Sequence, residues 1–388
     1  FVLKNVVERN PLIRVHLIVL KYFGYILFES QRFKRLHCFR GVVFSVSFVL
    51  FNVTQFVDLF KNSSNIDEIT KNAATTLLFA TTSFRMINFY WNRLRYVNVV
   101  VFVDDEMREM IKSPSEIVEK ISSSAISKQR KLTASFWIIA LITGNLMCIH
   151  SLVAALFFTT DGKPKLILPS WVPCSDYTKH FYLIYAVQYY IMNVGMLIVP
   201  CWHSFIVSLM VFVIIKLKIL NHKLTEIGAK STSEVDLKAD LVECIEERKK
   251  LRKFVEELSS LIRSSVFVDF IVFSVLLCAL LFQASQAEVG IQLAISFFYI
   301  LTMTTILWMY YHHANEITIY SDQLTLSAYE CRWYEFSVSF RKQLFLFMTS
   351  AGPIRIHAVL VEMKLDTFLA ILRASYSYFT LLTNIASD

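Results

Sequence analysis

The stretch that organises the sequence is its last one, LDTFLAILRASYSYFTLLTNIASD (Leu365–Asp388). It is about long enough to cross a bilayer as a helix, which takes ~20 residues. At helical spacing one line along this helix is largely polar: Asp366, Ala370, Arg373, Ser377, Leu381, Asn384 and Asp388. A membrane helix with a polar stripe and an apolar back is typical of a pore lining. Packing in a helix bundle, with Ser and Thr bonded to neighbours, explains the same pattern, and the residues leave both interpretations open.

The composition predicts an all-α, polytopic membrane protein. The chain has 388 residues, of which 55% are hydrophobic, and a mean hydropathy of +0.50. Soluble domains are about 45–50% apolar. The net charge of +8 would suit a nucleic-acid partner in a soluble protein. Because the basic residues lie beside the apolar runs, we interpret them as topology signals and expect no nucleic acid to bind.

Apolar runs predict seven transmembrane helices, at about 41–60, 72–91, 132–158, 180–215, 264–282, 291–311 and 365–388. Residues 1–40 form a basic, amphipathic segment that precedes them. Residues 216–262 are highly charged but keep apolar residues near one face, which predicts a cytosolic helical extension of spans 4 and 5. Residues 161–179 contain three prolines and predict an ordered lid between spans 3 and 4. Residues 312–364 precede span 7 and contain a Gly352–Pro353 break.

The distribution of Lys and Arg predicts the orientation. Residues 1–40, 92–131 and 216–263 hold eight, eight and eleven, whereas residues 61–71, 159–180 and 283–290 hold two, three and none. The positive-inside rule then places the N-terminus in the cytosol and the C-terminus outside, which is inverted relative to G-protein-coupled receptors. The sequon at Asn62 falls in a loop that this topology places outside, where it is open to glycosylation.

No residue pattern indicates catalysis, so we expect no enzyme and no cofactor. The seven cysteines make no metal-binding spacing, and only Cys174 is expected on the extracellular side. The pair His312-His313 is more typical of a membrane edge than of a metal site. Asp269 is the main acidic residue in a span, and several would be expected in an ion-coupled transporter. Arg85 in span 2 is expected to snorkel or to pair.

The outer halves of spans 2, 3, 4 and 6 carry aromatic, Met and hydroxyl side chains without charge. These features predict a pocket for a small, neutral, apolar molecule, because burial supplies affinity and one or two hydroxyls orient the ligand. Ordinary bundle packing produces similar faces and remains the alternative. The candidate ligand residues are Phe79, Thr82, Ser83, Cys148, Ile149, Leu152, Tyr182, Tyr185, Tyr189, Met192, Phe298, Tyr299 and Met303.

The C-terminal region resembles that of insect odorant receptors. The resemblance is carried by an Ala-Tyr-x-x-x-Trp-Tyr motif, a Phe-Arg-Lys triplet, the Gly-Pro break and a Thr-Phe…Ser-Tyr-x-Tyr-Phe-x-Leu-Leu ending. These elements comprise Ala328, Tyr329, Trp333 and Tyr334; Phe340, Arg341 and Lys342; Gly352 and Pro353; and Thr367, Phe368, Ser375, Tyr376, Tyr378, Phe379, Leu381 and Leu382. The related gustatory receptors end in Thr-Tyr, five apolar residues and Gln-Phe, whereas this chain has Ser377-Tyr378 and Asn384-Ile385, so that family is the second alternative.

The resemblance implies an odorant-binding subunit of a tetrameric, non-selective cation channel in the plasma membrane of olfactory neuron dendrites, permeable to monovalent and divalent cations and surrounded by membrane lipid. It implies that span 7 lines the pore, with Leu381 and Ile385 as a hydrophobic gate and Asn384 at a polar constriction. A cytosolic anchor in 312–364 would join subunits through a Tyr329–Lys342 helix that includes Trp333, Tyr334 and Arg341. The family's co-receptor (Orco) carries a long insertion between spans 4 and 5, and the compact segment here implies a ligand-tuning subunit that pairs with Orco.

Overall fold

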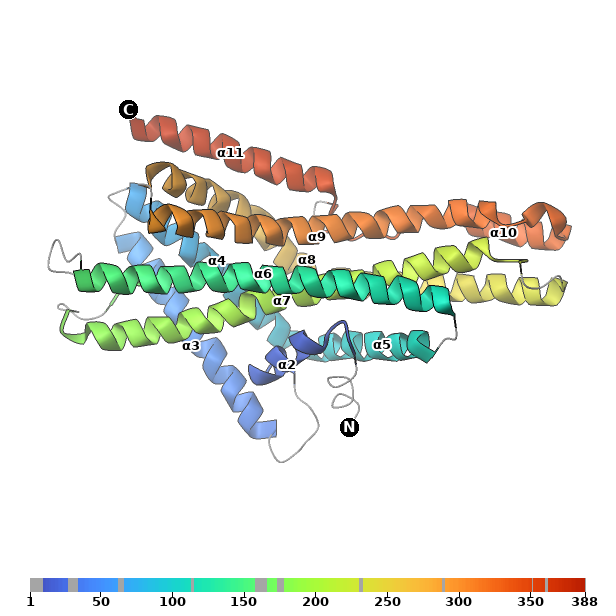
Figure 1. Cartoon of the computed structure of the whole chain (residues 1–388), viewed down its shortest axis with the longest axis horizontal. Coiled ribbons are helices and arrows are strands. Elements are labelled where there is room, and N and C mark those ends of the chain that lie inside the picture. Colours follow the sequence, from blue (N-terminus) through green and yellow to red (C-terminus); the bar gives the residue numbers. More distant parts are fainter. Residues whose placement is uncertain are drawn as a thin grey trace.

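The computed structural model describes residues 10–26, 34–61, 66–112, 115–157, 166–172, 178–229, 233–287, 290–350, 352–359 and 362–387. Over these residues the fold is built almost entirely of α-helices, which confirms the predicted all-α class (Figure 1). Cys174, Asn62 and Asp388 lie outside the described residues, and so does the side chain of Ile385.

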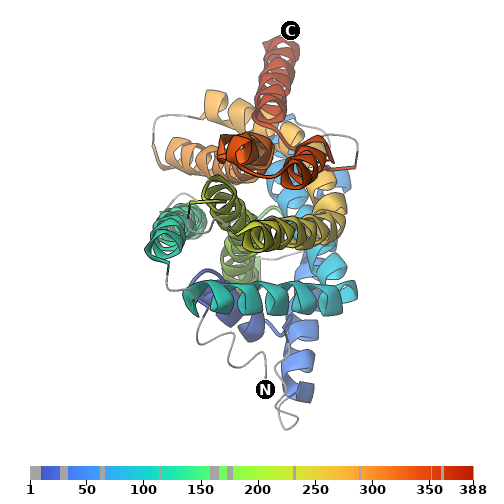
Figure 2. The same ribbon diagram turned by 90° about the vertical axis from the view of Figure 1, so that its right-hand side faces the viewer.

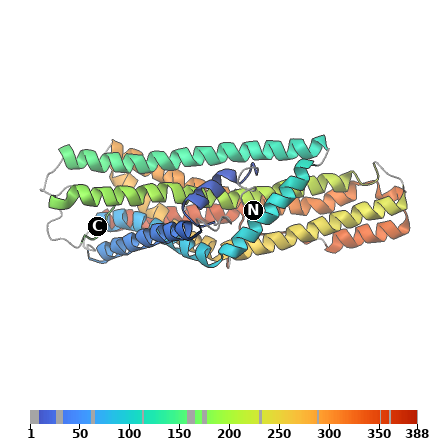
Figure 3. The same cartoon turned by 90° about the horizontal axis from the view of Figure 1, so that it is seen from below.

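Four long helices run side by side along the molecule (Figures 1 and 3): α6 (Glu116–Phe157), α7 (Phe181–Thr225), α8 (Glu234–Gln286) and α9 (Ile291–Glu330). The 53 residues of α8 rise about 80 Å at 1.5 Å per residue, well beyond the ~30 Å of a bilayer core. The charged part of α8 therefore continues the apolar part without a break. The helical extension predicted from the sequence covers residues 216–262. The extension of span 4 is shorter, because α7 ends at Thr225 in a turn at Gly228.

Within the described part of the chain, five helices are long and apolar enough to cross a membrane: α3 (Lys34–Lys61), α6, α7, α8 and α9. α4 (Ile66–Trp91) and α11 (Leu365–Ser387) lie alongside them, with α4 against α8 and α11 against α8 and α9. Helix α3 begins at Lys34, before Gly41, where span 1 was expected to begin. Gly24 lets the preceding chain approach this helix closely. A Cβ on Gly24, whose φ is +75°, would meet the carbonyl oxygen of His37 at 2.2 Å.

The core is centred on α7, which lies between the other layers in Figure 2. In its most apolar window 94% of the residues are buried, compared with 17% in α3. α2 (Arg14–Tyr22) packs against the middle of α7, where His16 Nε2 lies 2.9 Å from Ser204 Oγ. The surface of α3 that is not covered by protein is free to face lipid.

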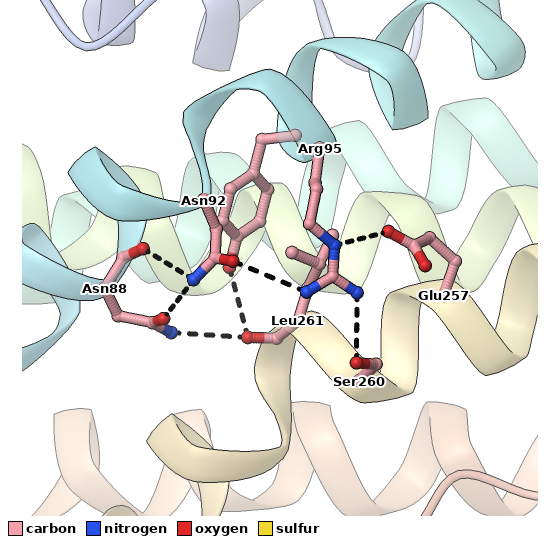
Figure 4. A network of polar contacts seen from close by, with 7 residues as sticks. Asn88, Asn92, Arg95, Glu257, Ser260 and Leu261 are labelled. Carbon is pink, nitrogen blue, oxygen red and sulfur yellow. Dashed lines mark hydrogen bonds and ion pairs between the residues drawn. The ribbon is translucent and has the colours of Figure 1, made fainter.

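A polar network fixes the junction between α4 and α5 (Arg93–Lys112) against α8 (Figure 4). Asn92 caps α4 by donating to the carbonyl of Asn88 at 3.0 Å, and Asn88 donates to the carbonyl of Leu261 at 3.3 Å. One turn further, Arg95 donates to Glu257 at 2.7 Å and to Ser260 at 3.0 Å. The Arg95 hydrogen bond lowers the pKa of Glu257. The network holds α5 at an angle to α4 across α8.

A buried ion pair joins α4 to α8. Arg85 donates to the carboxylate of Asp269, and the two side chains are 4% and 9% exposed. A charge buried without a partner is strongly destabilising, so each residue needs the other. The structure thus shows that Arg85, expected to snorkel or to pair, is paired with the acidic residue that stood out in span 5.

The chain turns back at the far end of the long helices. The expected single helix Tyr329–Lys342 is wrong: α9 ends at Glu330, a 3-10 turn follows (Trp333–Glu335), and α10 (Val338–Ser350) folds back along α8 and α9. The break has a packing reason, because the extended Phe336 places its ring on Gly228, where a Cβ would lie 2.2 Å from it.

α11 lies on the edge of the molecule, as Figures 1 and 2 show. Ile371 and Ser375 face the bundle and are buried, at 2% and 1% exposure. The opposite face is exposed and carries every described member of the polar stripe: Asp366, Ala370, Arg373, Ser377, Leu381 and Asn384. The periodicity of the sequence therefore gives the correct outward face of this helix within the single chain.

Candidate functional site

An apolar cavity of about 70 Å³ lies where α4, α6, α7 and α9 meet beneath the lid. Its walls are Thr75, Leu78 and Phe79 on α4; Ala140, Thr143, Gly144 and Met147 on α6; Met192, Gly195, Met196, Val199 and Pro200 on α7; Tyr299, Thr302 and Met303 on α9; and Leu168. Among the described residues, no charged side chain lines it. The cavity is therefore suited to a neutral molecule held by burial.

Breaks in helix regularity provide the space. Pro200 has no N–H, so it cannot donate to the carbonyl of Met196 one turn earlier in α7. Gly144 on α6 faces the same methionine, and a Cβ there would lie 2.1 Å from Met196 Sδ. Gly195 is looser, since its nearest neighbours would be ring carbons of Phe48 and Phe79 at 3.6 and 3.8 Å. The Phe48 and Phe79 rings stack 4.6 Å apart and form a rigid wall.

The hydroxyl groups in the walls already have acceptors. Tyr299 donates to the carbonyl of Ala74 at 3.0 Å and thereby ties α9 to α4. Thr302 bonds the carbonyl of Phe298 at 2.7 Å, and Thr143 bonds that of Ile139 at 2.9 Å, with the two hydroxyls 3.2 Å apart. These groups offer a ligand mainly acceptor lone pairs. Four methionines (Met147, Met192, Met196 and Met303) supply adaptable, polarisable walls.

The lid is held from α7 and α3. The side-chain oxygen of Gln188 accepts from the backbone N–H groups of Ile167 and Leu168 at 2.9 and 3.2 Å, and its nitrogen donates to the Leu168 carbonyl at 3.0 Å. The N–H of Trp171 donates to the carbonyl of Thr54 at 3.0 Å. These bonds seat Leu168 over the cavity. Over residues 166–172 the lid predicted from the prolines is ordered in this way.

Four of the thirteen predicted ligand residues line the cavity: Phe79, Met192, Tyr299 and Met303. Thr82 lines a smaller void beside Arg85, and Ser83 is buried with its hydroxyl unpartnered.

The remaining predicted residues do not line the cavity. Cys148 is buried, and its carbonyl accepts from the Tyr185 hydroxyl at 3.0 Å. Leu152, Tyr185 and Phe298 are half-buried, whereas Ile149, Tyr182 and Tyr189 are exposed.

The comparisons identify the family. The sequence model of the family described as "7tm Odorant receptor" matches residues 65–376. The chain belongs to the insect odorant receptor family. This membership decides between the alternatives in favour of an odorant receptor, a sensory receptor rather than an enzyme. The apolar candidate spans and the family membership make it a multi-pass membrane protein.

Curated relatives of this receptor match along most of its length. Odorant receptor 56a of Drosophila melanogaster is 28% identical over 401 residues, covering 96% of this chain and 95% of the relative. Odorant receptor 30a of the same species is 25% identical and covers 97% of both chains. Odorant receptor 10 of Aedes albopictus is 27% identical and covers 85% of this chain and 88% of the relative.

The fold of the receptor is that of a solved insect olfactory receptor. OR5 from Machilis hrabei superposes with a TM-score of 0.82 over 98% of this chain and 100% of its own, at 14% identity. The same protein in complex with eugenol gives a TM-score of 0.85 with the same coverage. At this identity the likeness shows the fold alone.

Proposed function

We propose that this receptor is the odorant-binding subunit of a heterotetrameric, ligand-gated, non-selective cation channel formed with the co-receptor Orco. It would act in the plasma membrane of sensory neuron dendrites and pass monovalent and divalent cations. The N-terminus lies in the cytosol and the C-terminus outside, following the Lys and Arg distribution. In this orientation the cavity is in the outer half of the membrane.

The ligand is a small, neutral, mainly apolar volatile. Its site is supported by the uncharged walls, by hydroxyls whose hydrogens are already engaged, and by the four methionines. The related OR5 was solved with eugenol, a ligand of the same kind. Because burial rather than directed bonds provides affinity, size and shape select the odorant.

Helix α9 couples the cavity to α11. Tyr299 and Met303 on α9 line the cavity, and α9 contacts α11, which packs mainly against α8. An odorant that fits better when α9 is displaced favours the state in which α11 moves with it. A ligand that bound both states equally would open nothing, so the cavity must differ between them.

The observation that carries the proposal is the exposed polar stripe of α11. A membrane helix with Asp366, Arg373 and Ser377 on its uncovered face needs water beside it. Four such faces around one axis supply that water, with Leu381 and Ile385 closing the path by a narrow apolar ring and Asn384 beside them. The far ends of α9 and α10 join the subunits through exposed side chains that include Tyr329, Tyr334 and Arg341, beside the half-buried Trp333.

The test is Leu381→Ala in cells that also express Orco. We expect raised current without odorant or altered ion selectivity, with an unchanged rank order of odorants. Leu183→Ala is the matched control, because Leu183 is as exposed as Leu381 but lies at the start of α7. Normal gating and permeation in the Leu381 variant would remove this residue from the gate.

A further inference from the structure

A second cavity, a groove of about 590 Å³, lies between α6, α7 and α9 and is separate from the odorant cavity. Its walls come from residues 120–132, 211–218 and 308–316. In each helix this is where the most apolar segment gives way to charged residues. The groove therefore lies at the level of the lipid headgroups, and in the proposed orientation it faces the cytosolic leaflet.

The rim of the groove is positively charged. Lys120 and Lys128 reach it from α6 and Lys218 from α7, and the first two have no ion-pair partner in the described part of the chain. Lys218 Nζ lies 4.5 Å from the centre of the Tyr320 ring, and it forms no ion pair with a carboxylate among the described residues. The groove has one carboxylate of its own, Glu316, whose oxygen lies 3.7 Å from His312 Nε2. The net charge of the groove is therefore positive and favours an anionic ligand.

The floor of the groove offers hydrogen-bond acceptors. Gln129 is 3% exposed and donates through Nε2 to Ser208 at 3.2 Å and to Thr133 at 3.3 Å. Its Oε1 is buried and has no hydrogen-bond partner among the described residues. His313 bonds the Met309 carbonyl through Nδ1 at 2.7 Å. Since a carbonyl accepts, Nδ1 carries the proton, and Nε2 of the neutral ring is an acceptor. An unpartnered buried acceptor destabilises the protein until a donor reaches it.

The walls between rim and floor are apolar. Ile121, Leu132 and Ile214 line the groove, and Trp308 stacks on His312 with ring centroids 4.9 Å apart. Trp308 is 37% exposed, as expected of a tryptophan at a membrane interface. These side chains can contact the glycerol and upper acyl chain of a lipid.

We propose that the groove binds the headgroup of an inositol phospholipid of the cytosolic leaflet. The phosphate groups lie among Lys120, Lys128 and Lys218, and ring hydroxyls donate to His313 Nε2 and to Gln129 Oε1, whose side chain turns toward the groove to accept them. Basic grooves beside membrane helices on this side suit anionic headgroups. Phosphatidylserine fits less well, because its ammonium group would lie among three lysines. The proposal relies on the proposed orientation but not on odorant gating.

The test uses the purified full-length receptor and fluorescent phosphatidylinositol 4-phosphate. The triple variant Lys120→Gln, Lys128→Gln and Lys218→Gln removes the rim. Each basic residue near an anionic surface contributes about a factor of five, so affinity is expected to fall on the order of 100-fold. The triple variant Lys249→Gln, Lys250→Gln and Lys253→Gln removes the same charge from an exposed face of α8 and should bind as the parent does. Equal losses in both would overturn the site.

Two further measurements exclude misfolding of the variant as the cause of lost binding and distinguish a membrane lipid from a soluble inositol phosphate. Replacing the three rim lysines by arginine keeps the charge and should keep binding. Unlabelled phosphatidylinositol should compete better than phosphatidylserine, which has the same net charge, and Gln129→Met should reduce that preference. Equal competition by the two lipids overturns the role of the hydroxyls. Competition by soluble inositol 1,4-bisphosphate as strong as that of the lipid overturns the assignment to a membrane lipid.

The binding assay contains neither odorant nor Orco. Failure of the lipid proposal therefore leaves the odorant channel proposal untouched, and failure of odorant-gated current leaves the lipid result interpretable.

Discussion

Gly144→Ala provides a size test of the odorant cavity. A Cβ at this position would lie 2.1 Å from Met196 Sδ, and ordinary contact begins at 3.4 Å, so the sulfur must move by at least 3.4 − 2.1 = 1.3 Å. Met196 and Gly144 both line the cavity, so the displaced side chain and the added methyl group both take space from a ligand. Removing room for about one methylene changes binding by ~1–3 kcal/mol, or roughly 10- to 200-fold.

The assay is a set of odorant dose–response curves from cells expressing the variant with Orco. The odorants form a series of apolar volatiles that differ only in chain length. We expect the half-maximal concentration to rise at least about tenfold for the largest active members and to change little for the smallest. The best ligand should become a shorter one.

Gly195→Ala is the matched control. It adds the same methyl group to a glycine that lines the same cavity in a neighbouring helix, and its closest contact would be an ordinary 3.6 Å. We expect its dose–response curves to stay within about threefold of the parent, because little must move. The reasoning would be refuted if Gly144→Ala shifted every odorant equally, or if the two alanine variants behaved alike.

Three further predictions concern the framework around the cavity. Asp269→Asn should destabilise the purified receptor by about 3–5 kcal/mol, because it leaves Arg85 charged and buried without a partner. Adding Arg85→Gln should recover much of this loss. If thermal unfolding showed that the two losses add, the pairing would be contradicted. Gln188→Leu removes four hydrogen bonds to the lid and should speed odorant dissociation, which is measured as a faster decay of the current on washout. An unchanged decay would show that these hydrogen bonds do not control odorant release. Arg95→Gln should cost under about 1 kcal/mol, since Arg95 and Glu257 are 40% and 44% exposed. The pKa of Glu257 is lowered from 4.5, so the stabilisation by the Arg95–Glu257 ion pair is complete above about pH 4.5 and is lost as the pH falls through the lowered pKa. A difference in thermal unfolding between the parent and Arg95→Gln that persisted in strong acid would contradict this ion pair as its source.

The outward face of α11 was predictable because polar side chains in a membrane helix are costly unless they face water or protein. Polar residues therefore recur at helical spacing along one side of the helix. Ser377 and Leu381 lie on this side and are exposed, as the spacing predicts. Arg85 and Asp269 were each conspicuous for the same reason. Their pairing was not predictable, because 184 positions separate them in the chain.

The cavity-facing residues of α6 were harder to predict. This helix is apolar on all sides in its membrane part, so hydrophobic period does not distinguish a face on lipid from a face on protein. The expected Cys148, Ile149 and Leu152 do not line the cavity, whereas Gly144 and Met147 do. Cys148 lies about one helical turn beyond Gly144. The residues that mark the cavity in the sequence are those that are uncommon inside helices: a glycine in α6 and a proline in α7. At such residues neighbouring helices can leave space between them.

The central claim, that the exposed stripe of α11 faces the ion path, is tested most directly by cysteine accessibility. Ser377→Cys and Ser375→Cys place the same thiol two residues apart, one exposed and one buried at 1% exposure. A membrane-impermeant, positively charged thiol reagent is applied outside during odorant-evoked current in cells that also express Orco. We predict that modification of Ser377→Cys reduces the current while Ser375→Cys and the parent are unaffected. Block of Ser375→Cys without block of Ser377→Cys would contradict the account.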